Sequence, residues 1–203
     1  ISRDEENKLL EDLKKRTDFE AARMQRYLEM PDLSRTPGSP LYEMVERVKN
    51  VPTQKGFDII DVPELVPATV SFDMFGFSPD HPARSKSDTY YVDDENILRT
   101  HDTVFWYYYL NLPEIKARIE KNEHLGTLCF GKVYRKDEID RHHMNVFHQI
   151  GGWYLQPDSD GELTLDDLKK VLSEIVQSIF GPDIKFRFNE DTFPYTDPSL
   201  EVE

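Results

Sequence analysis

The chain has 203 residues, of which 38% are hydrophobic and 12% aromatic, enough apolar side chains for one globular domain with an appendage. Its 39 Asp and Glu residues against 25 Lys and Arg residues give a formal net charge of −14, which would repel a polyphosphate backbone and argues against direct nucleic-acid binding by this chain alone. A single cysteine, Cys129, excludes an internal disulfide framework and a zinc cluster, and without an apolar run of about 20 residues or a signal-peptide pattern we expect a soluble, cytoplasmic protein with no membrane partner.

The first 40 residues are predicted to form an appendage. Residues 4–30 are highly charged with a thin apolar stripe, typical of one solvated helix with a single contact face. Residues 31–40 contain Pro37, Gly38 and Ser39 and no periodicity, which indicates a linker. We therefore divide the chain into residues 1–40, a charged helix and linker, and residues 41–203, the main domain.

The main domain shows strand patterns that cluster along the chain. Residues 41–51 predict a short helix, and residues 57–62 a strand that ends at Pro63. Aromatic and β-branched residues predict further strands over 88–92, 126–134, 146–155 and 184–188. One long amphipathic helix is expected over 165–180, capped by Thr164. The order predicts an α+β fold with an antiparallel sheet flanked by helices.

The most informative segment runs from Gly131 to Gln149 and reads as strand, loop, strand. Arg135 leaves the first strand, and an arginine can grip phosphate or carboxylate oxygens with two hydrogen bonds. Phe147, on the return strand, could stack on a purine. The structural alternative, a hairpin whose arginine pairs with a surface acid and whose phenylalanine is core, has about even odds for this segment taken alone.

Four segments together are similar to one family. Residues 131–149 resemble motif 2 of class II aminoacyl-tRNA synthetases in the form of the phenylalanyl-tRNA synthetase alpha subunit. Three more segments match this family in the same order: 80–84 with 88–90, 98–101, and 193–198 with the Glu201-Val202 pair that follows. The helix and strand before Pro63 resemble motif 1, which implies a subunit interface and sheet support. Several ordered motifs are a far stronger signal than any single one.

The resemblance implies an ATP site. Arg135 would be the catalytic residue, which binds the α-phosphate and stabilises the charge that develops when the amino-acid carboxylate attacks it. Asp137 would lie near the adenine amino group, Phe147 would stack on the adenine, and His143 would belong to a loop that closes over the nucleotide. Mg²⁺ is expected as a companion of ATP, but no metal site is readable in the sequence.

The resemblance also implies an amino-acid site. Gln149 would contact the substrate amino group, while His101 and Thr103 occupy positions at the amino-acid site. Phe193 and Tyr195 would form an aromatic wall for a phenylalanine ring.

Each of these residues also has a purely structural interpretation. Without its flanking match, His101 would be a core histidine by about two to one. His143 and its neighbour His142 could belong to a solvated loop or, less plausibly, a metal site, and Asp137 could serve solubility alone. The aromatic run 105–110 is better explained as a buried helix face or a subunit contact than as part of the site.

The sequence departs from the family at three points. Gly151 stands where the family usually has a glutamate that helps to hold the substrate ammonium, and Tyr195 stands where phenylalanine is usual, which affects discrimination between phenylalanine and tyrosine. No segment resembling motif 3 follows the Leu200–Glu203 end, so we expect a catalytic core truncated before motif 3 and inactive by itself.

The resemblance implies a phenylalanine–tRNA ligase alpha chain, which activates phenylalanine with ATP and transfers it to tRNA(Phe). The expected partners are phenylalanine, ATP, the beta subunit, and tRNA(Phe) bound mainly through other domains or that subunit. Two alternatives stay open: a non-catalytic synthetase-like module that binds a small molecule or a partner, motivated by Gly151 and the missing motif, and a class II enzyme for another amino acid.

Overall fold

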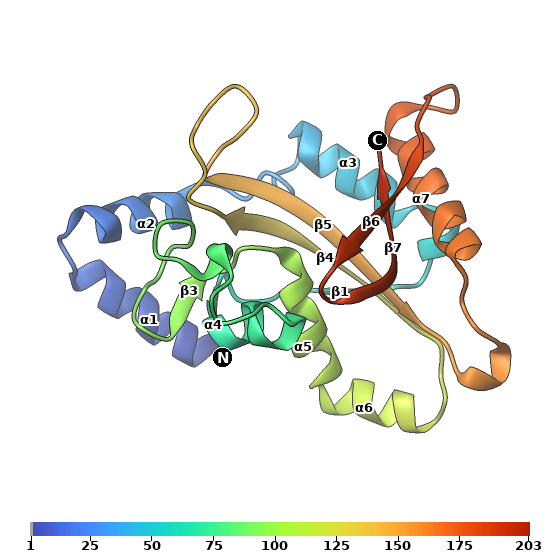
Figure 1. Cartoon of the computed structure of the whole chain (residues 1–203), viewed down its shortest axis with the longest axis horizontal. Coiled ribbons are helices and arrows are strands. Elements are labelled where there is room, and N and C mark those ends of the chain that lie inside the picture. The colour runs from blue at the N-terminus through green and yellow to red at the C-terminus, as the bar shows by residue number, and fades with distance from the viewer. Residues whose placement is uncertain (1) are drawn as a thin grey trace.

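A three-stranded sheet forms the centre of the computed structural model, which describes residues 2–203 (Figure 1). The strands β1 (Asp58–Ile60), β4 (Leu125–Tyr134) and β5 (Val146–Leu155) lie in the order β1-β4-β5. β4 and β5 pair antiparallel from Leu125↔Leu155 to Tyr134↔Val146, whereas β1 runs parallel to β4. The predicted α+β class is confirmed, with one parallel pair in a sheet that we expected to be antiparallel.

Two shorter strand pairs, both antiparallel, accompany the central sheet. β2 (Leu65–Pro67) pairs with β3 (Asn96–Leu98), and β6 (Phe188–Phe193) pairs with β7 (Thr196–Val202). The turn between β6 and β7 carries Tyr195, which points this hairpin towards the aromatic residues described below.

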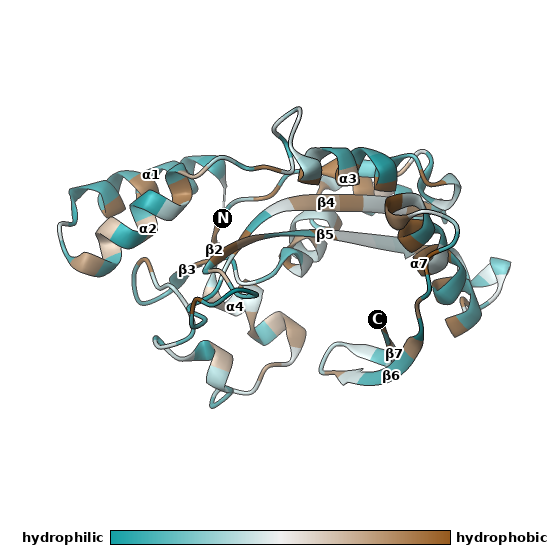
Figure 2. Cartoon of the chain, turned by 90° about the horizontal axis from the view of Figure 1, so that it is seen from above, coloured by the Kyte–Doolittle hydropathy of each residue, from teal (hydrophilic) through white to brown (hydrophobic). Residues whose placement is uncertain are grey.

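The sheet has a different environment on each face because successive side chains of a strand point to opposite sides. On one face, Leu125 and Cys129 of β4 belong to a buried cluster with Phe105 and Tyr109 of helix α5 (Phe105–Leu110). Figure 2 shows α3 along one side of β4 and β5, and α4 with the β6–β7 pair on the other. The face that bears Cys129 is the one on which the candidate site forms.

The first 30 residues form two helices, not the single helix that we predicted. Helix α1 (Arg3–Lys15) is followed by α2 (Phe19–Glu29), and the side chain of Asp18 accepts a hydrogen bond from the backbone of Ala21 at the start of α2. An aspartate at this position is a strong helix-start signal, which the long apolar stripe concealed. The two helices pack together at one end of the molecule (Figure 1).

The helix pair is also attached to the sheet. Its apolar residues share a buried cluster with Tyr90 and with Tyr134 at the end of β4. The side chain of Lys132, 3% exposed, donates to the carbonyl oxygens of Leu28 and Met30 at the end of α2, both at 2.8 Å. Residues 30–39 contain no helix or strand, and the proposed domain division after residue 40 stays a prediction.

The remaining helices are α3 (Pro40–Lys49), α4 (Ala68–Ser71), α6 (Pro113–Glu120) and α7 (Leu165–Phe180). The helices predicted over 41–51 and 165–180 are confirmed as α3 and α7. Thr164 caps α7 through hydrogen bonds with Asp167, and Gly181 ends it with a φ of 98°. No helix within residues 2–203 is both long and apolar enough to cross a membrane.

The strand predicted over residues 88–92 is wrong. This segment is irregular and makes one isolated bridge, between Tyr91 and Ile97. Its aromatic character reflects burial, because Tyr90 is 0% exposed and packs edge-on against Tyr27 at 5.6 Å. β-Propensity reflects how well a side chain packs on a half-buried surface. Here the packed surface is part of the core but not of a sheet, so the propensity misled the prediction.

The strand predicted over residues 184–188 is also wrong, because the strand begins only at Phe188 as β6. The pairing of Phe193 with Thr196 fixes the register of this hairpin from its turn outwards. Because of this register, the strand includes residues 189–193, although few of them are β-branched. Most of the predicted segment 184–188 lies outside the strand.

Candidate functional site

A cavity of about 350 Å³ brings together three of the residues predicted for the site, His101, Arg135 and Asp137. These come from three different segments, the stretch after β3, the end of β4 and the loop between β4 and β5. The other lining residues are Phe72, Phe77, Ala83, Asp88, Thr89 and Thr100. The lining therefore combines apolar side chains with a cation and two carboxylates.

Arg135 is held by two contacts that orient its guanidinium. Its Nε donates to the carbonyl oxygen of Thr100 at 3.0 Å, and the guanidinium lies 5.1 Å from the centre of the Phe147 ring. The backbone of Arg135 continues the strand pairing by donating to Asn145. The terminal amino groups can then donate to oxygens of a ligand in the cavity, as a phosphate or carboxylate site requires.

His101 is neutral in this setting. Burial lowers the pKa of its imidazole, and its Nε2 lies 2.8 Å from the carbonyl oxygen of Ser71. A nitrogen next to a carbonyl must carry the proton, so Nδ1 is the acceptor. Among residues 2–203 this buried Nδ1 has no hydrogen-bond partner. An unpaired acceptor beside a cavity is suited to a donor on a ligand.

Gln149 and Thr103 lie on either side of the backbone of Asp102. The side-chain Oε1 of Gln149 accepts a hydrogen bond from the Asp102 backbone N–H at 3.0 Å. Thr103 is half-buried in the short 3-10 helix η4 (Asp102–Val104). On β5, Gln149 and Phe147 face the same side, because they are two residues apart. The strand therefore places both predicted residues on the face that carries η4.

An aromatic group surrounds Tyr195. Its ring lies 5.3 Å from Phe75 and 6.3 Å from Trp106, in both cases edge-to-face. Phe193 lies 6.1 Å from Tyr195 but is 39% exposed. Phe75 also contacts His101, at 5.1 Å, which joins this group to the cavity. Phe75, Trp106, Phe193 and Tyr195 thus form one contiguous aromatic group.

His143 lies outside this group. It is exposed in the loop between β4 and β5, where its Nδ1 lies 2.9 Å from the carboxylate of Asp140 in the same loop. Phe147 contacts Arg135 but does not line the cavity. The predicted ATP residues are thus divided between the cavity wall, which has Arg135 and Asp137, and its surroundings.

Sequence reasoning missed several lining residues. Thr100, Phe77 and Asp88 line the cavity, and Phe75 supplies the contact between His101 and Tyr195. Thr100 and Asp88 lie in segments that had already matched the family, so these matches were the available signal. Phe75 and Phe77 carry no sequence signal that separates them from core residues.

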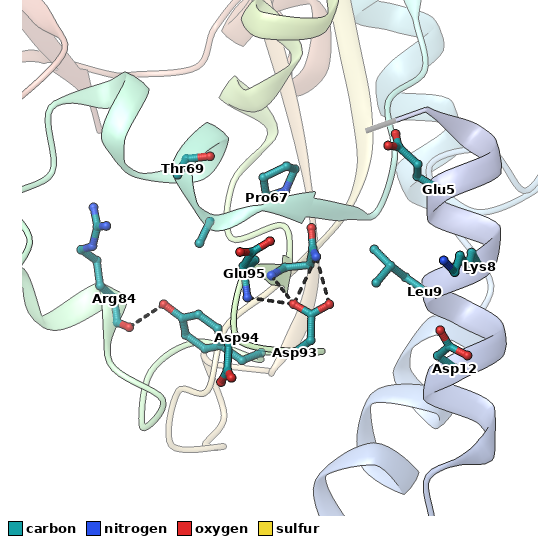
Figure 3. A pocket seen from close by; sticks show the side chains of 13 residues that line it. Glu5, Lys8, Leu9, Asp12, Pro67, Thr69, Arg84, Asp93, Asp94 and Glu95 are labelled. Atoms are coloured by element: carbon teal, nitrogen blue, oxygen red, sulfur yellow. Dashed lines mark hydrogen bonds between the residues drawn. The ribbon is translucent and has the colours of Figure 1, made fainter.

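A second cavity, of about 880 Å³, lies between α1 and the β2–β3 pair, and Figure 3 shows its lining side chains. None of the predicted site residues lines it. Two cations line it, Lys8 and Arg84. The carboxylates outnumber them and come from Glu5, Asp12, Asp93, Asp94 and Glu95. Such a lining disfavours phosphates and carboxylates, so the smaller cavity is the better candidate for a nucleotide.

A metal site is not evident from the side chains. Within the part of the chain that the structure describes, no group of three or more His, Cys, Asp or Glu side chains could hold a metal ion. The buried thiol of Cys129 stands apart from the chemistry, since burial raises its pKa to about 12.

Comparison with known families identifies the family of this chain. The family described as "tRNA synthetases class II core domain (F)" matches residues 27–203. The chain belongs to this class II family. The match includes the sheet, the cavity and the aromatic group, and it begins within α2.

Among curated proteins, several phenylalanine–tRNA ligase alpha subunits are similar to this class II core. The one from Streptomyces avermitilis is 36% identical over 173 residues, which cover 81% of this chain and 45% of that protein. The one from Mycoplasmoides gallisepticum is 35% identical over 178 residues, which cover 87% of this chain and 50% of that protein. The one from Thermotoga neapolitana is 30% identical over 201 residues, which cover 98% of this chain and 57% of that protein. The chain thus spans about half the length of these relatives, and the resemblance to this family is confirmed.

A solved structure shares the fold of this class II core. The pyrrolysyl tRNA synthetase PylSc of Desulfitobacterium hafniense matches with a TM-score of 0.57 and 17% identity, over 90% of this chain and 60% of that chain. At this identity the likeness concerns the fold alone.

Proposed function

We propose that this chain is the catalytic core of a phenylalanine–tRNA ligase alpha chain, which activates phenylalanine with ATP to phenylalanyl-adenylate and transfers it to tRNA(Phe). The proposal is carried by one observation: a chain of this family has Arg135 and His101 lining one cavity, beside an aromatic group centred on Tyr195. A nucleotide phosphate, an amino-acid backbone and an aromatic side chain each have a chemically matched surface there.

The reaction needs positioning and charge stabilisation more than covalent chemistry. The carboxylate of the amino acid attacks the α-phosphorus of ATP, and pyrophosphate leaves on the opposite side. Arg135 would donate to the oxygens of that phosphate, where negative charge increases in the transition state. Because Thr100 and Phe147 already orient the guanidinium, little reorganisation would accompany the step.

The remaining predicted residues would bind and orient the two substrates. Asp137 would accept from the adenine amino group and Phe147 would stack on the purine, with His143 in a loop above it. His101, Thr103 and Gln149 would hold the amino-acid backbone, while Phe193 and Tyr195 would contact the ring. ATP would bring Mg²⁺ as a companion of its phosphates.

For partners, we propose the beta subunit, since the relatives are named alpha subunits, and tRNA(Phe) bound mainly outside this chain. The net charge of −14 supports this division, because an acidic surface contributes little to binding of a polyphosphate. The second candidate, a non-catalytic binding module, is favoured by Gly151 in place of a glutamate.

Exchange of pyrophosphate into ATP separates these functions. We expect the full-length gene product, assayed with and without the beta subunit, to catalyse exchange that depends on phenylalanine. Tyrosine is the matched control amino acid, since it differs by one hydroxyl. If phenylalanine supports no exchange even with the beta subunit, the ligase function is wrong and the binding-module function is favoured. Faster exchange with tyrosine would assign the enzyme to another amino acid.

A further inference from the structure

Asp102 is a buried carboxylate with one oxygen that has no hydrogen-bond partner among the described residues. The residue is 8% exposed, and within residues 2–203 its Oδ2 makes no hydrogen bond and no ion pair within 4.0 Å. An unpaired ionised group in a protein interior costs several kcal/mol of stability, by the general cost of removing charge from water. Such a group is expected where a ligand supplies the missing partner.

Gly151 provides the space that this carboxylate occupies. A Cβ atom added to Gly151 would lie 2.4 Å from Oδ2 of Asp102 and 3.1 Å from the Phe105 ring. Any side chain at position 151 would therefore collide with the carboxylate in its present place. The sequence lacks a glutamate at this position, and the carboxylate of Asp102 lies where the side chain of that glutamate would begin.

The neighbours of Asp102 in the sequence belong to the cavity and to the aromatic group. Thr100, two residues earlier, holds Arg135, and His101 presents an unpaired Nδ1. On the other side, Trp106 contacts the aromatic group at Tyr195. Asp102 thus directly follows two residues that line the cavity, Thr100 and His101, and precedes a residue of the aromatic group.

Gln149 by itself offers few free lone pairs to an ammonium group. Its Oε1 already accepts the backbone N–H of Asp102, and its amide nitrogen can only donate. An ammonium carries three donors and no acceptor, so it requires oxygen or nitrogen lone pairs. The lone pairs with no partner nearby are those of Asp102 Oδ2 and His101 Nδ1.

We infer that Asp102 holds the α-ammonium group of the amino-acid substrate, in the role left open by Gly151, and that this pairing selects α-amino acids over analogues that lack the ammonium. The inference rests on the proposed function for the identity of the substrate. It assigns the carboxylate to η4 rather than to β5.

The test uses calorimetric binding of three ligands to the full-length gene product. Phenylalanine carries the ring, the ammonium and the carboxylate; 2-phenylethylamine lacks the carboxylate, and 3-phenylpropanoate lacks the ammonium. In Asp102→Asn we expect roughly tenfold to a hundredfold weaker binding of phenylalanine and 2-phenylethylamine, the usual range for a hydrogen bond between charged groups. Binding of 3-phenylpropanoate should be unchanged or tighter, which also shows that the variant is folded with its aromatic site intact.

Asp160→Asn is the charge-matched control, because Asp160 is exposed and lies outside the site. It should bind all three ligands as the unaltered protein does. Equal weakening of all three ligands in Asp102→Asn would overturn the inference in favour of a structural role. Unchanged phenylalanine binding in that variant would overturn it as well, while leaving the proposed function intact. If the unaltered protein binds neither phenylalanine nor 3-phenylpropanoate, the proposed function itself fails.

A pH profile adds a readout that a structural role would not produce. Arg99, Arg135 and the Cys129 thiol face the carboxylate, and burial raises the pKa of that thiol to about 12. Affinity for 2-phenylethylamine should fall as the pH drops below about 6, where Asp102 takes up a proton, and Asp102→Asn should lose this component. His101, adjacent in sequence, also titrates, but its contribution stays in the variant profile. Identical profiles would overturn the inference.

Discussion

At the scale of single residues, Arg135 and Asp102 are opposite cases of charge in a protein. Arg135 has a carbonyl and an aromatic ring as partners, and it was predicted from a sequence pattern. Asp102 has a carboxylate oxygen with no partner, and no pattern distinguished it. Both lie where a ligand would complete their hydrogen bonds, which connects the electrostatics of the site to its function.

Replacing Arg135 should remove charge stabilisation in the transition state. We expect Arg135→Ala to slow phenylalanine-dependent pyrophosphate exchange by at least about two orders of magnitude, with the fold intact. Exchange rates and circular dichroism of the full-length gene product would measure both. Arg26→Ala is the matched control, because Arg26 lies exposed on α2. A normal exchange rate in Arg135→Ala would refute the assigned role.

The buried carboxylate of Asp102 should make the free energy of unfolding depend on pH. Desolvation raises its pKa from 3.8 to about 6, against the opposing influence of Arg99, Arg135 and backbone N–H groups. Because the folded protein holds the proton more tightly than the unfolded chain, this group costs stability as the pH rises through the range from 3.8 to about 6. The full cost, about 3 kcal/mol, applies above that range.

Asp102→Asn should therefore be more stable than the unaltered chain near pH 7.5, by up to about 3 kcal/mol. The difference should shrink towards zero below about pH 4, where both side chains are neutral. Urea unfolding of both proteins at several pH values would measure it, since other carboxylates cancel in the comparison. A variant that is less stable at every pH would mean that the carboxylate supports the fold.

At the scale of elements, β4 connects the site to the N-terminal helices. Its Lys132 lies on the side away from the cavity and donates to carbonyl oxygens at the end of α2, where a helix has unpaired acceptors. The Nζ atom also lies 3.3 Å from the Glu64 carboxylate. Three residues further on, Arg135 leaves the same strand for the site, so the strand is anchored close to the catalytic position.

Removing this lysine should destabilise the whole unit. We expect Lys132→Met to lower the free energy of unfolding by about 3 kcal/mol, because it leaves carbonyl oxygens and a carboxylate without their buried cation. Denaturant titration of the chain would measure this. Lys170→Met is the control, because Lys170 lies exposed on α7, and it should change stability by less than about 0.5 kcal/mol. Equal effects of the two substitutions would contradict the proposed attachment.

At the scale of the whole molecule, the net charge affects which ligands the surface attracts, and the chain topology determines which segments form the candidate site. The net charge of −14 disfavours broad contact with a nucleic-acid backbone, whereas the candidate site is a cavity in which a single cation acts locally. Residues from the segments 72–89, 100–101 and 135–137 line this cavity, and the β6–β7 turn adds Tyr195 to the aromatic group beside it. Such a site exists only when the chain is folded.

The sequence by itself determined the strands over 126–134 and 146–155, α7 with its Thr164 cap, and the family, because these depend on local patterns and on motif order. It also selected Arg135, His101 and Tyr195 as candidates. It did not separate α1 from α2, where a cap residue interrupts a continuous apolar stripe, and it mistook the buried segment around Tyr90 for a strand.

Only the tertiary structure decided which of the candidates meet. It joined His101 to Tyr195 through Phe75 and left His143 in an exposed loop. It also placed the carboxylate of Asp102 in the space above Gly151, two positions that are 49 residues apart in the sequence. The physical reason is that a contact between distant segments depends on strand pairing and packing together, and neither is encoded in the local pattern of either segment.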